Sequence, residues 1–403
     1  MWSLAFRNIF RHRFRAGATL LAMVVGVVCL ISAGGFVNDI FYKLREGTIR
    51  SELGHIQVFA EGYLTHGRVA PYQYMIPDDD PIGSRLAALA HVKYVIARLK
   101  FSALLSNGVA DLPVIGEGVE PEKENQVFEG LQVLAGERLA SAQPYGVMLG
   151  EGVARALDVT VGDTVMLLVT TPEGAMNTLD LDVVGVFRTL SKEYDARAVR
   201  VVLSSAKDLL LVNSVHSYTV FLSDTRFTDA VVAQIRRMTG DGTYEVRSWE
   251  QLAGFYQKVV AMYDRQFGAL VFVVLLMVVL AIVNSINISV RERMPEFGTL
   301  LVLGFKARQL VYMIFAESLL LGAVGAGIGV VFGGLVAVLA SWHGIEMPAP
   351  PNMNEGYMAE IRLNTWILTS SALVAWLASV LAAVWPAMRM RQVQPTELLK
   401  GCY

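Results

Sequence analysis

Side chains that could carry out chemistry are few in this 403-residue chain, and they do not form a catalytic pattern. A phosphate-binding loop ends in Gly-Lys-Ser/Thr, but the sequence contains no Gly-Lys dipeptide. It also lacks His-Glu-x-x-His, Gly-x-Ser-x-Gly and Cys-x-x-Cys, the signatures of a zinc protease, a nucleophile elbow and a redox pair. The six histidines are scattered, and Cys29 and Cys402 do not suggest a structural disulfide. We therefore expect no catalytic residue, no metal and no directly bound cofactor.

An acidic run at Asp78, Asp79 and Asp80 is the one pattern that resembles a metal site. Prolines flank it in "IPDDDPIG", and a helical pattern follows. Aspartates in that position commonly cap the next helix. We therefore favour a solvated turn that caps a helix over a metal site.

Among the polar residues within the apolar runs, Glu317, Asn284 and Asn287 are candidates for a functional role. A charge inside a membrane is a functional candidate by default, so Glu317 could carry protons. The other apolar runs offer it no obvious relay partner. We expect Glu317 to have a structural partner, such as Arg308 or a neighbouring helix, and the two asparagines to bond helix to helix rather than bind a ligand.

The apolar runs are long enough to cross a membrane. Hydrophobic residues make up 54% of the chain and charged residues 17%, and a bilayer core of ~30 Å requires about 20 apolar residues in a helix. Four runs qualify, at 18–38, 267–289, 310–340 and 366–388. The expected fold class is an α-helical membrane protein with four transmembrane helices and a large extracytoplasmic mixed α/β domain between the first two.

Charge is distributed unevenly between the segments that connect these runs. Segments 1–17, 290–309 and 389–403 together hold 11 basic and 3 acidic residues, whereas 39–266 holds 22 basic and 29 acidic residues. Basic flanks mark the cytoplasmic side. We therefore expect both termini and the 290–309 loop in the cytoplasm of a bacterial inner membrane, with 39–266 and the short 341–365 loop outside. The acidic balance of 39–266 argues against nucleic acid as a partner.

Residues 1–17 alternate apolar and arginine side chains with helical spacing. This pattern predicts an amphipathic helix on the cytoplasmic leaflet, or a basic flank that sets topology. A cleaved signal peptide is the competing interpretation, but the apolar run that follows exceeds the usual ~7–15 residues.

Within 39–266, alternating and helical patterns predict a mixed α/β domain. We expect one subdomain split between about 50–130 and 215–250, with a β-rich insert between the two parts. The last stretch, "EQLAGFYQKVVAMYDRQF", predicts a helix that runs directly into the second span. Between spans two and three, "RERMPEFGTLLVLGF" (291–305) predicts a short amphipathic helix. Inside span three, Gly325, Gly329 and Gly333 recur every four residues, the spacing that permits close helix packing.

Several stretches together resemble one family, the MacB/FtsX/LolC-type ABC transporter permeases. These are "LAFRNIFRHRFRAGATLLAMVVGV" at the start, "LGEGVARALDVTVGDTVML" (149–167), "VRERMPEFGTLLVLGFKARQLVYMIFAESLLLGAVGAGIG" (290–329) and "PAMRMRQVQPTELLKG" (386–401). The resemblance covers the whole chain, and 290–329 is its most specific part. Phe297 and Val302 depart from the residues common in the family. "GHIQVFAEGYL" is most similar to the lipoprotein-release (LolC/LolE) branch.

The resemblance implies a mechanism and partners. Two permease copies, identical or different, bind a dimer of cytoplasmic ATPases that carry the ATP and magnesium, and an external domain moves to extract or export a lipoprotein, lipid or other amphiphile. Membrane lipids and a periplasmic or outer-membrane accessory protein are further partners. The residues that would couple to the ATPase are Arg291, Arg293, Glu296, Phe297, Leu300, Leu301 and Leu303. Two alternatives remain: a helix that only sets topology, and a transmembrane signal relay that activates a cell-wall hydrolase without transport.

Overall fold

The computed structural model describes residues 13–67, 69–127, 131–189, 191–240, 242–348, 354 and 356–390. The chain forms two compact units. We call them the helical unit (Met1–Tyr42, Val259–Met347, Met358–Tyr403) and the α/β unit (Lys43–Lys258, Pro348–Tyr357). The predicted N-terminal amphipathic helix falls mostly, and the cytoplasmic tail almost entirely, outside the described residues.

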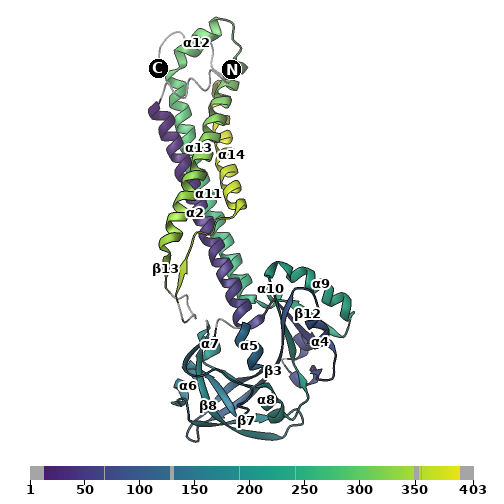
Figure 1. The fold of residues 1–403 in the computed structure, drawn as a ribbon. Helices are drawn as coiled ribbons and strands as arrows, with labels where there is room; N and C mark the ends of the chain where they lie inside the picture. The colour runs from purple at the N-terminus through teal and green to yellow at the C-terminus, as the bar shows by residue number, and fades with distance from the viewer. Residues whose placement is uncertain are drawn as a thin grey trace. The chain divides into compact units, whose positions relative to one another are not determined.

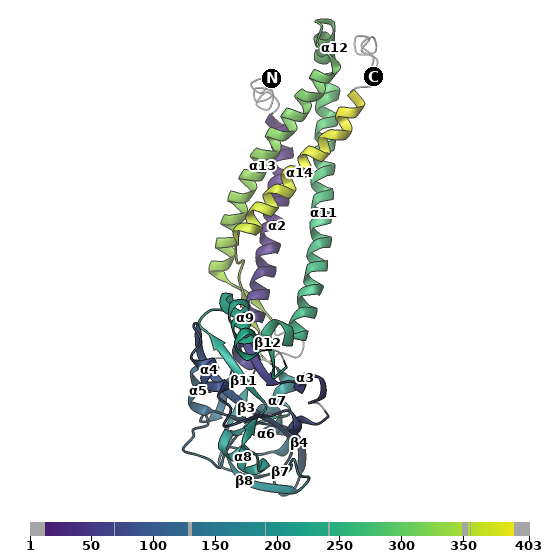
Figure 2. The same ribbon diagram turned by 90° about the vertical axis from the view of Figure 1, so that its right-hand side faces the viewer.

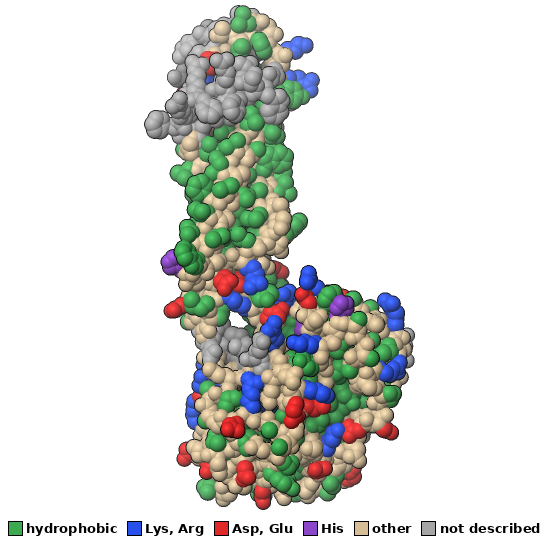
Figure 3. Space-filling view, viewed as in Figure 1, with side chains coloured by type: hydrophobic (Ala, Val, Ile, Leu, Met, Phe, Trp, Pro, Cys, Tyr) green, Lys and Arg blue, Asp and Glu red, His purple; other side chains and the backbone are tan. Residues whose placement is uncertain are grey.

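Four long helices dominate the helical unit (Figure 1). They are α2 (Arg13–Thr48), α11 (Gly254–Glu292), α13 (Ala307–His343) and α14 (Thr365–Met390), and the short α12 (Met294–Val302) joins α11 to α13. Each long helix contains a stretch that is long and apolar enough to span a membrane. Between its ends, the visible face of this unit carries mostly hydrophobic side chains (Figure 3), which agrees with a lipid environment.

Small residues let the four helices approach one another. α13 and α14 lie side by side (Figure 2), and a Cβ added at Gly322 of α13 would collide with Ser379 of α14. Met23, Val278 and Ala378, from α2, α11 and α14, form a buried cluster. Two short strands, β13 (Ile345–Met347) and β14 (Tyr357–Ala359), pair in the connection between α13 and α14.

The α/β unit is built on one ten-stranded sheet, with the main order β12-β1-β11-β3-β4-β9-β6-β8-β5 and with β7 pairing to β3 and β8. One end of this sheet forms a split lobe, since its segments come from both ends of the unit's sequence. This lobe contains β1 (Ile56–Ala60), β11 (Ser217–Leu222), β12 (Tyr244–Ser248), the first part of β3 (Val92–Ser106), α4 (Ile82–Ala87) and α9 (Thr228–Thr239). Its apolar core includes Ile56, Val220 and Ile235.

Smaller elements connect the parts of the split lobe: η1 (Ile49–Leu53), α3 (Tyr63–His66), η2 (Pro71–Gln73), β2 (Ile76–Pro77), β10 (Ser214–Val215), η3 (Thr225–Phe227) and α10 (Trp249–Leu252). Asp80 accepts a hydrogen bond from the Ile82 amide at 2.8 Å, at the start of α4, and Asp78 pairs with Lys207 at 2.6 Å. Of the three aspartates of the acidic run, Asp80 therefore bonds to the first turn of α4, whose N-cap residue is Pro81, and Asp78 forms a surface ion pair.

The other end of the sheet forms an insert lobe. It contains the second part of β3, β4 (Asp111–Val119), α5 (Pro121–Val127), β5 (Gln132–Gly136), β6 (Gly146–Gly150), α6 (Glu151–Leu157), β7 (Thr164–Thr170), β8 (Met176–Arg188), α7 (Lys192–Asp195), β9 (Ala198–Val202) and α8 (Leu203–Leu210). Leu99, Val147, Leu167 and Val201 lie fully buried in its core.

The chain passes from one lobe to the other inside strand β3. Residues Val92–Arg98 pair with β11 of the split lobe, and pairing with β4 begins at Leu99. The expected split subdomain, about 50–130 and 215–250, extends to residue 130 and would include β4. That boundary is wrong, because β4 pairs in parallel with β9 and so belongs to the insert lobe. Periodicity in the sequence does not identify the partner of β4, which is set by long-range pairing.

Candidate functional site

The short helix α12 occupies the segment that the sequence analysis singled out between spans two and three. Pro295 lies in its first turn, where a missing amide costs no helical hydrogen bond, and Glu296 complements the positive end of the helix dipole there. After Val302 the chain turns at Gly304, whose φ of +94° suits glycine at a helix C-terminus. Local sequence therefore begins and ends this helix.

One face of α12 packs into the helical unit. Phe297 is 1% exposed and contacts Leu310 and Ile314 of α13, and half-buried Leu300 lies in the same cluster. Arg293, just before α12, is 6% exposed, and its guanidinium lies 5.1 Å from the Phe297 ring centroid. This buried face positions α12 on α13.

The opposite face of α12 is exposed. Glu296 and Thr299 of α12 and Leu303, in the turn directly after it, recur at intervals of three or four residues, and Leu303 is 72% exposed. Arg291, at the end of α11, is also exposed. The predicted coupling residues therefore divide between two faces: Arg293, Phe297 and Leu300 point inward, whereas Glu296 and Leu303 are accessible. The side chain of Leu301 lies outside the described residues.

Glu317 of α13 forms an ion pair with Arg293. The carboxylate Oε2 lies 3.0 Å from the guanidinium Nη1, and Arg293 also reaches Glu296 at 3.4 Å. The sequence analysis named Arg308 as an example of its partner; the structure gives Arg293 instead. Arg308 lies nine residues before Glu317, about two and a half turns along α13, whereas the turn into α12 brings Arg293 back against that helix.

The three glycines of α13 lie against α2. A Cβ added at Gly325, Gly329 or Gly333 would come within 3.1, 2.6 and 2.8 Å of side-chain atoms of Met23, Val27 and Ile31. Those residues are themselves spaced by four along α2. Both helices thus present one face to the other over two turns.

At the predicted asparagine positions, Asn284 is exposed and Asn287 is half-buried. The hydrogen bond that crosses between α2 and α11 here joins the neighbouring Ser285 to Thr19 at 2.5 Å. The hydroxyl groups of Thr19 and Ser285 therefore form a polar contact between α2 and α11 next to these asparagines.

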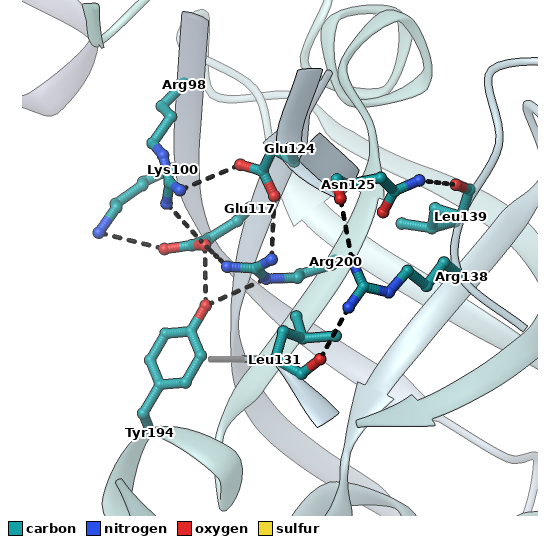
Figure 4. A network of polar contacts seen from close by, with 10 residues as sticks. All are labelled: Arg98, Lys100, Glu117, Glu124, Asn125, Leu131, Arg138, Leu139, Tyr194 and Arg200. Carbon is teal, nitrogen blue, oxygen red and sulfur yellow. Dashed lines mark hydrogen bonds and ion pairs between the residues drawn. The ribbon is translucent and has the colours of Figure 1, made fainter. Parts of the chain in front are cut away.

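A buried network of charges, which the sequence analysis did not find, lies where β3 passes between the lobes (Figure 4). Arg98 contacts Glu117 at 3.3 Å and Glu124 at 3.0 Å, and Arg200 contacts the same carboxylates at 3.5 and 2.9 Å. Tyr194 donates to Glu117 at 2.8 Å. The network joins β3, β4, α5, β9 and α7.

Lys100 completes this network, reaching Glu117 at 3.1 Å from a partly exposed position. Burial disfavours ionised Glu117, but Lys100, Arg98 and Arg200 outweigh it and hold its pKa well below the usual range. Next to this network, Arg138 donates to the carbonyls of Leu131 and Asn125. One signal was available in the sequence, because an antiparallel hairpin over 93–119 places Lys100 opposite Glu117.

Two histidines of the α/β unit are buried, and their pKa values lie below the ordinary value of a histidine. Burial lowers the pKa of His55 and of His216 to about 4. No group of three or more His, Cys, Asp or Glu among the described residues could hold a metal. The buried charge network and the Arg293–Glu317 ion pair hold the fold together, and the exposed face of α12 is the candidate functional surface.

Two known protein families match this chain, one over most of the α/β unit and one over the second part of the helical unit. Residues 16–238 match the family described as MacB-like periplasmic core domain, and residues 268–395 match the FtsX-like permease C-terminal family. The first match alone covers more than half of the chain, and it includes the insert lobe and the split lobe up to residue 238.

Individual relatives are distant but extend over most of the chain. The transmembrane protein LolC of the lipoprotein-releasing system of Xylella fastidiosa is 23% identical over 404 residues, covering 96% of this chain and 94% of that protein. LolE of Haemophilus influenzae is 23% identical with the same coverage. The macrolide export ATP-binding/permease protein MacB of Brucella abortus is 25% identical over 85% of this chain and 53% of that protein. With four membrane-length helices and an α/β unit that matches a periplasmic core domain, this chain belongs to the MacB/FtsX/LolC-type ABC transporter permeases.

Proposed function

We propose that this chain is the permease subunit of an ABC transporter whose ATPase is a separate protein. The ATPase dimer would dock on the exposed face of α12, formed by Glu296, Thr299 and Leu303, with Arg291 beside it. The observation that carries this proposal is the division of α12 into two faces. A helix held firmly by Phe297 and Arg293, with its other face open, can transmit the force of a docked partner to α13.

The LolC and LolE relatives, which this chain matches over 94% of their own length, are named transmembrane proteins, and this supports an ATPase on a separate protein. The Brucella relative is named an ATP-binding/permease protein, and this chain matches only about half of it. In the proposed arrangement, ATP and magnesium bind to the partner. A second permease copy, identical or related, completes the complex.

The charge distribution supports an orientation in the bacterial inner membrane, with both termini and α12 in the cytoplasm. The α/β unit would then lie outside. α11 is one continuous helix from Gly254 to Glu292, so the chain runs from the end of the split lobe to α12 without a break in the helix.

For the substrate class, we propose a lipoprotein or another amphiphile handled on the outer side of the membrane. The end-to-end matches to proteins of a lipoprotein-releasing system support this choice. Proteoliposomes that contain the complex should release a fluorescent lipopeptide when ATP is added. ATP hydrolysis without release, together with binding of a cell-wall hydrolase, would instead favour a signal relay.

Replacing exposed Leu303 by Asp tests the docking site. The side chain contributes little to packing, because it is 72% exposed, so insertion and thermal stability should be unchanged. The ATPase that co-purifies with the unmodified chain from native membranes should be lost. Val109→Asp, at a 93% exposed position in the α/β unit, is the matched control and should retain the ATPase. Full retention by Leu303→Asp would place docking elsewhere.

A further inference from the structure

The connection between α13 and α14 contributes a residue to the α/β unit. Asn354 lies in the segment Pro348–Tyr357, which belongs to that unit by its contacts. Its side-chain Nδ2 donates to the carbonyl oxygen of Thr189 at 2.8 Å and to Oδ2 of Asp195 at 2.6 Å. Both acceptors belong to the insert lobe.

The two acceptors of Asn354, Thr189 and Asp195, are themselves held in place by hydrogen bonds and close packing; we call this pair the Asn354 seat. Asp195 is 2% exposed, and its carboxylate also accepts from the amide and the hydroxyl of Thr189 at 3.0 and 2.7 Å. The backbone of Asp195 lies directly against Gly150, where an added Cβ would collide with the Asp195 carbonyl. Hydrogen bonds to a carboxylate are stronger than those between neutral groups. Asn354 therefore bonds to a tightly packed part of the insert lobe, where Asp195 has little room to move.

Helix α7 links this seat to the buried network of charges. Asp195 accepts from Asn354, and the preceding residue, Tyr194, donates to Glu117 of β4 at 2.8 Å. Glu117 in turn pairs with Arg98, the β3 residue at which the chain passes between the lobes. A displacement at Asn354 would thus reach Arg98 through Asp195, the backbone that joins it to Tyr194, and the side chains of Tyr194 and Glu117.

The insert lobe is covalently continuous with the split lobe, whereas its link to the Asn354 segment is a pair of hydrogen bonds. The split lobe begins after α2 and ends where α10 leads into α11, whereas the Asn354 segment continues into α13 on one side and α14 on the other. We propose that Asn354 is a positioning residue through which movement of α13 and α14 drives the insert lobe independently of the split lobe, with β3 as the pivot. This inference rests on the proposed function, because ATPase action on α12 supplies the movement.

Hydrogen–deuterium exchange of the purified complex, with and without a non-hydrolysable ATP analogue, tests the proposal. In the unmodified complex, we expect the analogue to change exchange in peptides of both lobes, those containing α7 and those containing α10. Asn354→Leu keeps the size of the side chain but cannot donate a hydrogen bond. In this variant the response of α7 should vanish while that of α10 persists. Without nucleotide, residues 189–195 should exchange about tenfold faster, as expected when one charge-assisted hydrogen bond is lost.

Two further variants separate this role from general damage. Asn354→Asp places a carboxylate against Asp195 and should also abolish the α7 response, and the double variant Asn354→Asp/Asp195→Asn should restore it by re-creating one donor–acceptor pair. Asn213→Asp makes the same change at an exposed position of the α/β unit and should leave both responses intact.

Persistence of the α7 response in Asn354→Leu would overturn the inference. Failure of the nucleotide to alter either lobe of the unmodified complex would overturn the proposed function, and this inference with it.

Discussion

Replacing Arg293 by Met tests whether the buried ion pair holds α12 in place. The side chains of Arg293 and Glu317 are 8% and 18% exposed, and removing one partner of a fully buried pair costs about 3–5 kcal/mol. Partial exposure of Glu317 places the cost near the lower end, at about 3 kcal/mol. This free energy corresponds to a factor of about 100 in the equilibrium between two states of α12: seated, meaning packed on α13, and displaced from it.

Since the ATPase would bind seated α12, its apparent affinity should fall by up to about 100-fold in Arg293→Met. Glu317→Leu should cost less, because Arg293 keeps its contact with Glu296 at 3.4 Å. The double variant Arg293→Met/Glu317→Leu should bind better than Arg293→Met alone, since replacing both partners by apolar side chains is often nearly neutral.

Binding of the purified ATPase to each detergent-solubilised variant, measured by biolayer interferometry, gives the affinities. Thermal unfolding of the same samples shows whether the four-helix packing survives. Costs that add in the double variant would mean that Arg293 and Glu317 act independently. Wild-type affinity in Arg293→Met would mean that the ion pair does not position α12.

Other predictions follow from packing and charge. Gly329→Ala should destabilise the chain by about 1–3 kcal/mol, because its Cβ would meet Val27 at 2.6 Å, whereas Gly327→Ala, with no atom within 4 Å, should leave the melting temperature in detergent unchanged. Glu117→Gln should cost about 3 kcal/mol at neutral pH. Because folding lowers the pKa of Glu117, its contribution is present above pH ~4.5 and is lost as the pH falls further, so unfolding curves of variant and parent should converge in acid. Asp39→Ala should lower the melting temperature, since buried Asp39 accepts from the Glu360 amide at 2.9 Å; an unchanged value would show that this contact is dispensable.

Local patterns in the sequence predicted the parts of this protein that depend on local physics. Long apolar runs identify membrane helices because a bilayer sets their length, and the described part of the chain contains four helices that are long and apolar enough to span one. α12 was also predictable, because Pro295, Glu296 and Gly304 mark its limits. Which of its residues face inward was not predictable, since Phe297 is buried by α13, ten to twenty residues further along the chain.

Long-range pairing accounts for what the sequence did not reveal. The partner of Glu317 and the lobe that contains β4 depend on how distant segments meet. The same is true of the contact between Asn354 and Asp195, which are far apart in the sequence. A single sequence without comparison carries no signal for such contacts.

The shared strand β3 also constrains how this protein can be engineered. A chimaera that exchanges residues 99–210 with those of a relative would cut β3 in its middle, directly beside Arg98. The graft would then need its own counterparts of Glu117 and Glu124 to receive that arginine, which is 2% exposed. Compatible grafts should therefore be chosen by the charges around the cut rather than by overall sequence identity.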